Sequence, residues 1–347
     1  MIYNKNYWED VGLVIKNIPN IENLYGKKVL ISGSTGMICS SVVDIISYLN
    51  CFRDANILMT LANRNEKSIV KRFSNTGLDI SYSFIKYDAT QIVELDGDFD
   101  YIIHGAGSAS PDFFQEYPIE TIKNNVFGIY SFLNLLKRNN KGRLLYLSSS
   151  EIYGNRINNS SLPFKENEYG YIDILNPRSS YPNGKRVAET ICASFLKEYG
   201  TDFIVARPGH IYGPSFLPSD KKVSSQFTQQ VIKGRNIVLK SSGNQVRSYC
   251  YTLDCASAIL SLIINGKTGE AYNISNKNSI ASIYELAKEF ANCVNVKVVF
   301  QNPSDEERTA FNPMLNSSLD STKLERLGWK GLFDLKTGVR RTIMFSK

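Results

Sequence analysis

The chain has 347 residues, of which 43% are hydrophobic and 21% charged, an ordinary composition for a soluble globular protein. No apolar run approaches the roughly 18 to 20 residues that cross a bilayer. The first residues also lack the basic and apolar segments of a secretion signal, so we expect a cytoplasmic protein. The formal net charge of +7 comes from scattered lysines and arginines, which favours small polyanions over nucleic acid as partners.

Metal-binding and disulfide-forming residues are sparse. The six cysteines form no Cys-x-x-Cys pair, and the two histidines are His104 and His210. This leaves little material for a zinc site, and we expect no metal. A disulfide framework is also unexpected in a chain of this length without a secretion signal. The thiols are therefore interpreted as buried or incidental.

From residue 27 the sequence alternates short apolar runs with longer segments of helical period. Residues 1–26 precede this pattern as an extension with a short helix expected over 7–18, and the sequence does not say whether it serves packing or oligomerisation. Strands are expected over 29–32, 56–62, 82–87, 101–104, 143–148 and 202–206. Helices are expected over 36–49, 119–136 and 181–199. This alternation predicts the α/β class, with a parallel sheet covered on both faces.

A glycine-rich turn follows the first expected strand, in the sequence Lys28-Val-Leu-Ile-Ser-Gly33-Ser-Thr-Gly36-Met-Ile-Cys39. Gly33 permits a tight turn, and Gly36 lets the backbone approach a pyrophosphate at the helix N-terminus. Cys39 stands where a third glycine would allow close packing, but it is small enough to keep that packing with a slight shift. The turn predicts a dinucleotide-binding, Rossmann-type doubly wound sheet.

The end of the second strand bears on the choice of dinucleotide. It reads Leu61-Ala-Asn63-Arg64-Asn65, without the acidic residue that contacts the adenosine ribose of NAD. Arg64 can instead meet a 2′-phosphate, so NADP(H) is favoured and NAD(H) is the alternative. A solvated loop position is the structural interpretation of Arg64. Asp88, after the third strand, is a candidate for the adenine edge.

The segment Tyr181-Pro-Asn-Gly-Lys185 opens the last of these helices and places both side chains on one helix face. The lysine charge is expected to lower the pKa of Tyr181, about 10 when unperturbed, so that the phenol exchanges a proton with a substrate hydroxyl near neutral pH. Such a pair alone also describes a helix surface. However, the run Ser-Ser-Ser-Glu-Ile-Tyr-Gly over 148–154 supplies a hydroxyl for the reacting oxygen. The two elements in this order predict hydride-transfer chemistry.

From about Lys27 to about Trp329 the chain resembles the extended short-chain dehydrogenases, the NAD-dependent epimerase/dehydratase family of nucleotide-sugar enzymes. Besides the turn, the hydroxyl run and the Tyr/Lys pair, the matching pieces are Ile103-His104-Gly-Ala106, Asn125-Val-Phe-Gly128, Arg207-Pro-Gly-His-Ile-Tyr-Gly-Pro214, Arg247-Ser-Tyr-x-Tyr-x-x-Asp254 and Asp320-x-x-Lys323-Leu-x-x-Leu-Gly-Trp329. The resemblance implies hydride transfer at C4 of a nucleotide-diphosphate sugar. It also implies a homodimer that pairs the helices over 119–136 and 181–199.

After about residue 208, prolines and glycines interrupt the regular pattern. We therefore assign 27–207 to the dinucleotide-binding domain with the catalytic residues. Residues 208–347 become a smaller, mixed α/β and mainly substrate-binding portion with some return to the core.

The family resemblance also implies a role for each candidate site residue. The catalytic residues are Ser149, Glu151, Tyr181 and Lys185. The cofactor contacts are Gly33, Ser34, Thr35, Gly36, Met37, Ile38, Asn63, Arg64, Asp88, Ala89, Gly105, Ala106, Gly107, Asn125, Lys185 and Pro208. The substrate contacts are Ser108, Ser150, Glu151, His210, Gln226 and Arg247. Arg247 is placed against the diphosphate, which suits its bidentate capacity. A salt bridge for Arg247 and a structural role for His210 are the alternatives.

Three features bear on the net reaction and disagree. Glu151, with the segment Arg178-Ser-Ser-Tyr181-x-x-Gly-Lys-Arg-Val-Ala-Glu189, resembles the UDP-glucuronate decarboxylases. Ser150 stands where 4,6-dehydratases place an aspartate that donates a proton. The missing acid before Arg64 favours NADPH, which net reductases consume.

The favoured interpretation is therefore reduction of a nucleotide-linked 4-keto-6-deoxyhexose. In that reaction Tyr181 donates a proton to the ketone oxygen, and Ser149 hydrogen-bonds the same oxygen. Decarboxylation, 4-epimerisation and 4,6-dehydration are the alternatives. A non-catalytic dinucleotide sensor is a remote alternative, because such proteins lose the Tyr/Lys pair that is intact here.

Overall fold

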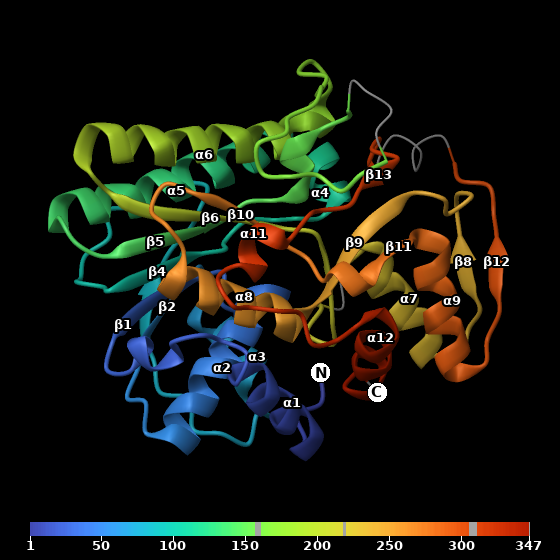
Figure 1. Cartoon of the computed structure of the whole chain (residues 1–347), viewed down its shortest axis with the longest axis horizontal. Helices are drawn as coiled ribbons and strands as arrows, with labels where there is room; N and C mark the ends of the chain where they lie inside the picture. The colour runs from blue at the N-terminus through green and yellow to red at the C-terminus, as the bar shows by residue number, and fades with distance from the viewer. Residues whose placement is uncertain (157–160, 218–219, 305–310, 347) are drawn as a thin grey trace.

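A parallel sheet forms the centre of the computed structural model, which describes residues 1–156, 161–217, 220–304 and 311–346. Within these ranges its seven strands lie in the order β10-β6-β5-β4-β1-β2-β3 (Figure 1). In that spatial order they span Ala271–Ile274, Asp202–Pro208, Arg143–Leu147, Tyr101–His104, Lys28–Ser32, Leu58–Asn63 and Ser83–Lys86. The chain starts at β1, runs outward to β3 and returns to the other side of β1. This reversal creates the switch point at which ligands bind in open α/β sheets.

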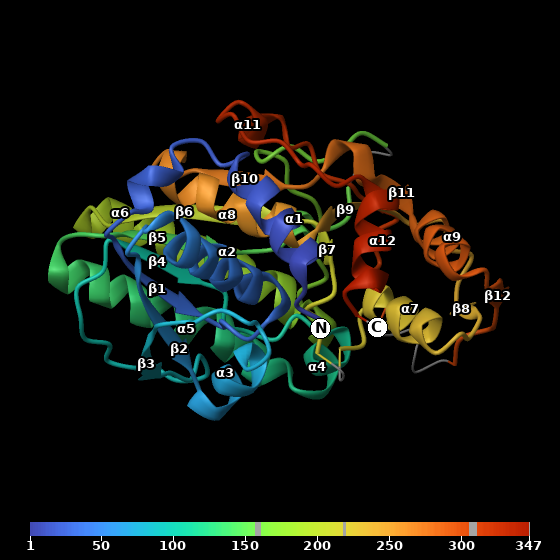
Figure 2. The ribbon, with the colours of Figure 1, turned by 90° about the horizontal axis from the view of Figure 1, so that it is seen from below.

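Helices cover both faces of the sheet, as a parallel sheet with buried strands requires. α5 and α6 lie on one face, whereas α2 and α8 lie on the other (Figures 1 and 2). The described helices are α1 (Lys5–Ile15), α2 (Met37–Arg53), α3 (Glu66–Phe73), α4 (Pro111–Glu116), α5 (Pro118–Asn139), α6 (Ser180–Tyr199), α7 (Val223–Ile232), α8 (Thr252–Asn265), α9 (Ile283–Val294), α11 (Thr322–Glu325) and α12 (Leu335–Met344), with the short 3-10 helices η1 (Ile21–Leu24), η2 (Ser150–Tyr153), η3 (Pro177–Ser179) and η4 (Lys277–Ser279).

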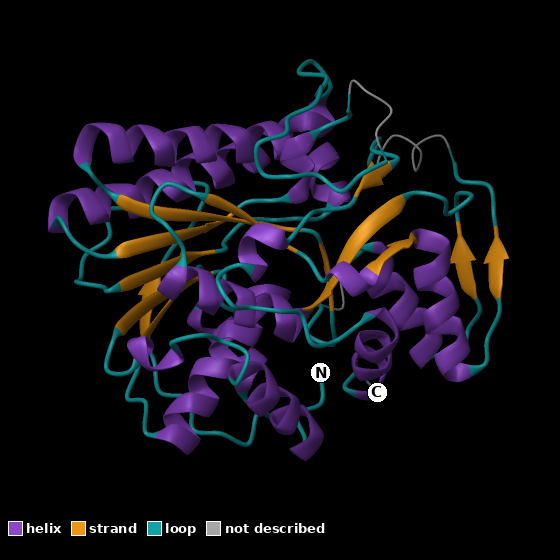
Figure 3. Cartoon of the chain, in the orientation of Figure 1, coloured by secondary structure: helices purple, strands orange, loops and turns teal. Residues whose placement is uncertain are grey.

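A second, smaller sheet stands beside the carboxyl ends of the large one (Figure 3). Its centre is β9 (Val246–Tyr251), which pairs with β7 (His210–Tyr212), β11 (Ile280–Ser282) and β13 (Asn316–Ser317). β8 (Ile237–Leu239) and β12 (Val298–Phe300) form a separate pair next to α7 and α9. This portion faces the edge of the large sheet where the predicted site residues gather.

The N-terminal extension packs within the chain. α1 lies against α2 and α8, and the Tyr7 hydroxyl donates to the buried Asp44 carboxylate at 2.6 Å. The two ends of the chain also meet, because Asp10 pairs with Arg341 at 2.7 Å and the Ile2 amide donates to the Phe345 carbonyl at 2.7 Å. The structure therefore gives the extension a packing role.

The strands and helices expected from the sequence are present, with ends that differ by a few residues. The pattern missed β10, which joins the sheet beside β6, and α8, which covers a face of the same sheet. Both come from the second half of the chain, so this half contributes directly to the core. Among the described residues, no helix is both long enough and apolar enough to span a membrane.

Candidate active site

The glycine turn between β1 and α2 has the geometry that a bound pyrophosphate needs. Gly33 has a φ of +71°, and a Cβ atom there would lie 2.8 Å from the Ala106 backbone nitrogen, so only glycine fits. Gly36 caps the N-terminus of α2, where free amides and the helix dipole favour an anion. The residues present therefore fit a dinucleotide.

Asn63 has a structural role that the sequence did not reveal. Its side-chain oxygen accepts hydrogen bonds from the Ser34 amide and hydroxyl, both at 3.2 Å, and its amide donates to Thr35 at 3.3 Å. The end of β2 thus braces the glycine turn. Arg64 beside it is exposed, and its charge joins hydrogen bonds from Thr90 in lowering the pKa of Asp88.

Cys39 packs where the third glycine is missing. A Cβ atom on Gly105 would collide with the Cys39 sulfur and with a methyl group of Leu147. A glycine in the neighbouring loop therefore makes room for the larger side chain, and helix α2 keeps its close approach to the sheet.

The other predicted cofactor residues also gather at the carboxyl ends of the strands. Met37 and Ile38 begin α2, Ala89 follows β3, Gly105, Ala106 and Gly107 follow β4, Asn125 lies in α5, Lys185 in α6, and Pro208 ends β6. Ser108, a predicted substrate contact, follows in the same loop after β4. Asn125 is already engaged, since it donates to Thr121 O and accepts from the Tyr146 hydroxyl. Among the described residues, no group of three or more His, Cys, Asp or Glu side chains could hold a metal ion.

Tyr181 and Lys185 are both buried near the start of α6, but their coupling differs from the prediction. The Lys185 ammonium donates to the Leu147 carbonyl at 2.6 Å and lies 5.8 Å from the centre of the Tyr181 ring. Burial raises the pKa of Tyr181 above its usual range, and a hydrogen bond with Ser149 opposes this rise. The expectation that Lys185 lowers the pKa of Tyr181 is therefore wrong for this state. Instead, burial lowers the pKa of Lys185 to about 7, although Glu189 raises it.

Two serines of the hydroxyl run after β5 make different contacts. Ser148 donates to Glu189, which also binds the buried Arg207 guanidinium at 2.6 Å. Ser149 instead caps η2, where its hydroxyl accepts from the Glu151 amide at 3.2 Å. The Ser149 hydroxyl lies beside Tyr181, as the family register implies.

The Arg207 guanidinium ties together the segments that carry these groups. Besides Glu189 in α6, it donates to the Tyr153 hydroxyl in η2 at 3.1 Å. That hydroxyl in turn donates to Asn273 in β10 at 2.5 Å. Arg207, in β6, is 2% exposed, so the guanidinium at the centre of this network is shielded from solvent.

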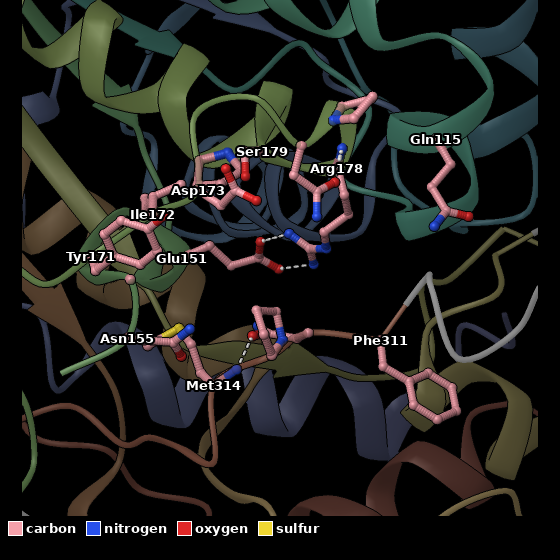
Figure 4. A pocket seen from close by; sticks show the side chains of 16 residues that line it. Gln115, Glu151, Asn155, Tyr171, Ile172, Asp173, Arg178, Ser179, Phe311 and Met314 are labelled. Carbon is pink, nitrogen blue, oxygen red and sulfur yellow. Dashed lines mark hydrogen bonds and ion pairs between the residues drawn. The ribbon is translucent and has the colours of Figure 1, made fainter. Parts of the chain in front are cut away.

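A cavity of about 630 Å³ is lined by Ser179 and Pro182, on either side of Tyr181 in the sequence, and an ion pair forms part of its wall. The Glu151 carboxylate accepts two hydrogen bonds from the Arg178 guanidinium, at 2.5 and 3.0 Å (Figure 4). Glu151 was a predicted site residue, but Arg178 was not. The lining residues are Gln115, Glu151, Gly154, Asn155, Tyr171, Ile172, Asp173, Asn176, Pro177, Arg178, Ser179, Pro182, Phe311, Asn312, Pro313 and Met314.

The predicted substrate residues do not all gather at this cavity. Arg247 on β9 is buried and donates to the Val246 carbonyl at 2.9 Å, and His210 on β7 lies 3.4 Å from the Ser317 hydroxyl. Burial lowers the pKa of His210 to about 3, with Arg247 and Lys222 adding to the effect, so its imidazole is neutral. Ser150 is buried in η2. Gln226 lies on the exposed side of α7, away from the cavity wall, and donates to the Lys221 carbonyl.

Comparison with known proteins places the chain among relatives of known class. The model of the NAD dependent epimerase/dehydratase family matches residues 29–275. UDP-glucuronic acid decarboxylase 5 of Arabidopsis thaliana is 30% identical over 318 residues, which cover 90% of this chain and 87% of that protein. UDP-glucuronic acid decarboxylase 1 of Xenopus tropicalis is 27% identical over 321 residues, which cover 92% of this chain and 72% of that protein.

Two solved structures share the fold. UDP-glucose 4-epimerase from Thermotoga maritima, with UDP-glucose, has a TM-score of 0.75 at 22% identity, and covers 92% of this chain and 98% of its own. A dTDP-glucose 4,6-dehydratase from Streptomyces venezuelae, with NAD bound, has a TM-score of 0.76 at 22% identity, and covers 92% and 96%.

The lowered pKa of Lys185 predicts a pH-dependent cost of folding. Between the folded value of about 7 and the ordinary value of about 10.4, the unfolded chain binds the extra proton, so stability rises with pH. The charged, buried lysine costs stability below this window. We expect Lys185→Met to gain stability relative to the native chain at pH 6, and to lose that advantage by about pH 10.

Urea unfolding at both pH values measures this difference. Lys197→Met, which removes an exposed lysine from the other end of α6, should show no such pH dependence. An equal effect of Lys185→Met at both pH values would contradict the lowered pKa.

Proposed function

This chain belongs to the NAD-dependent epimerase/dehydratase family, and we propose that it decarboxylates a nucleotide-linked hexuronate, with UDP-glucuronate as the first substrate to test. Membership makes it a nicotinamide-dependent enzyme of nucleotide sugars. The observation that carries the finer proposal is the Glu151–Arg178 pair in the cavity wall beside Tyr181. The relatives named as UDP-glucuronic acid decarboxylases, at up to 30% identity over 90% of the chain, support it.

The chemistry of the proposed reaction follows from the position of the carboxylate. The glycine turn of Gly33 and Gly36 would hold the dinucleotide, which when bound would supply reversible hydride transfer at sugar C4. Tyr181 takes the C4 hydroxyl proton, and Ser149 hydrogen-bonds the same oxygen. Once C4 is a ketone, the carboxylate on C5 belongs to a β-keto acid. The C5–C6 bond then breaks, CO₂ leaves, and the bonding electrons move into an enolate whose oxygen remains on C4.

Later steps restore the protonation states. A proton is added at C5, which quenches the enolate, and Tyr181 gives its proton back to the C4 oxygen. The net change is the exchange of a carboxylate for a proton, so the dinucleotide is unchanged overall. The burial of Tyr181 against Phe114, with ring centres 4.2 Å apart and planes 8° apart, excludes water from the phenol while this occurs.

Release of CO₂ from UDP-glucuronate by the full chain tests the proposal. We expect one CO₂ per UDP-pentose formed, without net accumulation of reduced dinucleotide, and a fall in kcat of about 10²- to 10⁴-fold in Tyr181→Phe because the proton carrier is lost. Tyr199→Phe, at the exposed end of the same helix, should keep full activity. Absence of CO₂ release by the native chain would refute the proposal.

Reduction of a nucleotide-linked 4-keto-6-deoxyhexose by NADPH is the second candidate. The observation that favours it is the exposed Arg64 that follows Asn63, without an acid at the end of β2. In that reaction the dinucleotide is consumed, and Tyr181 gives a proton to the ketone oxygen.

The dinucleotide preference separates the two candidates. Under the second candidate, the chain binds NADPH more tightly than NADH, and Arg64→Ser removes the difference by loss of a charge-assisted phosphate contact, about 10-fold or more. Under decarboxylation, NAD stays bound through purification, and Arg64→Ser leaves its affinity within about twofold. Titration calorimetry and mass identification of the released nucleotide measure both. The matched control is Arg53→Ser, which removes an arginine from the C-terminal end of α2, the end opposite the glycine turn.

We also propose a homodimer that pairs α5 and α6 of each copy. These helices carry exposed apolar side chains, namely Ile119, Ile122, Tyr130, Val187 and Tyr199. Exposed apolar side chains on neighbouring helices are typical of subunit contacts, and we refer to these five as the apolar strip.

Disruption of this strip should give monomers. We expect Val187→Glu to shift the sedimentation coefficient to that of a single chain, because a charge would be buried in the contact. Phe52→Glu, on an exposed part of α2, should leave the dimer intact. A native chain that sediments as a monomer would contradict the proposed contact.

A further inference from the structure

The Glu151–Arg178 pair is held rigidly beside the catalytic groups. Arg178 lies in η3, whose first residue is Pro177 and whose cap is the Asn176 side chain, which accepts from the Arg178 amide at 3.0 Å. η3 leads directly into α6 and Tyr181. Glu151 lies two residues after Ser149. The pair therefore joins the two segments that supply the reacting hydroxyls.

The charges around this pair do not balance. Arg247 is buried nearby, close enough for both Glu151 and Arg178 to influence its pKa, which burial lowers. The charge of a second guanidinium therefore acts on this pair, although the hydrogen bonds of Arg247 go to the carbonyls of Val246 and Leu315. The Nε atom of Arg178 is also buried, and within the described residues it has no hydrogen-bond partner. A buried cation requires a paired anion, so Arg178 can release Glu151 only to another carboxylate.

We propose that Arg178 selects the carboxylate of the substrate, and that Glu151 occupies this carboxylate's place while the cavity is empty. This inference rests on the proposed decarboxylation. When a hexuronate binds, its carboxylate replaces Glu151 on the guanidinium fork, and Glu151 turns toward the sugar ring. The exchange keeps Arg178 paired at every stage.

Selectivity follows from the same exchange. A neutral hexose carries no group that competes with a carboxylate for a bidentate guanidinium, so it leaves the pair closed and Glu151 engaged. The carboxylate carbon of a hexuronate is attached to C5, next to the C4 that Tyr181 and Ser149 serve. A carboxylate seat beside these two hydroxyls therefore agrees with the bonding order of the sugar, in which C5 follows C4.

Binding of UDP-glucuronate and UDP-glucose to the full chain tests the proposal. Titration calorimetry is carried out in a Tyr181→Phe background, which prevents turnover. We expect Arg178→Gln to weaken UDP-glucuronate binding about 10- to 100-fold, as loss of hydrogen bonds to a charged group does, and to change UDP-glucose binding less than about twofold. We expect Glu151→Gln to strengthen UDP-glucuronate binding, because the internal competitor loses its charge.

If Arg178→Gln weakened the binding of UDP-glucuronate and of UDP-glucose equally, the proposal would be overturned. Weaker binding of UDP-glucuronate in Glu151→Gln would also overturn it. Arg178→Lys guards against a folding defect in Arg178→Gln. It keeps the positive charge but loses the bidentate guanidinium, so it should weaken UDP-glucuronate binding by an intermediate factor and leave UDP-glucose binding unchanged. Arg156→Gln is the matched control. It removes the nearby Arg156–Glu168 pair of 3.1 Å, which lies outside the cavity wall, and should affect neither sugar.

The two proposals fail in different ways. Selective binding of UDP-glucuronate that depends on Arg178, without release of CO₂, supports the carboxylate seat and refutes the decarboxylase function. Release of CO₂ by the native chain, together with equal weakening of UDP-glucuronate and UDP-glucose binding by Arg178→Gln, refutes the seat and leaves the function standing.

Discussion

The buried ion pair between Arg207 and Glu189 holds the site together. Arg207 comes from β6, Glu189 from α6, and through Ser148 and Tyr153 the pair reaches the loop after β5 and the short helix η2. Loss of one partner from a buried pair leaves an uncompensated charge, typically at a cost of about 3–5 kcal/mol. The network therefore fixes the relative positions of the segments that carry Ser149, Glu151 and Lys185. A rigid base of this kind is what precise proton and hydride geometry requires.

Local backbone requirements made much of the fold predictable. Gly33, for example, stands in a turn that only glycine can adopt, so a motif of a few residues is enough to predict its role. The strands were visible as apolar runs because both faces of a parallel sheet are buried. β10 escaped because its four residues follow a long mixed segment, and only the tertiary fold brings them beside β6.

Individual residues of the site could be predicted from the sequence, but the interactions between them could not. Arg178 was visible as part of a family-like segment, yet its partner Glu151 is distant in sequence, so the pair was not. The predicted effect of Lys185 on Tyr181 failed because a backbone carbonyl, that of Leu147, competes for the ammonium group. No side-chain pattern encodes that competitor. Asn63 likewise braces the glycine turn through contacts that depend on how β1 and β2 lie side by side.

The closed Glu151–Arg178 pair has a consequence for the end of the catalytic cycle. The substrate enters with a carboxylate, but the product of the proposed reaction has none. Glu151 can then reclaim the guanidinium unopposed, and the same contact that admits the substrate helps to expel the product. Turnover would be driven forward by an anion that belongs to the protein, and product inhibition would be weak for electrostatic rather than steric reasons.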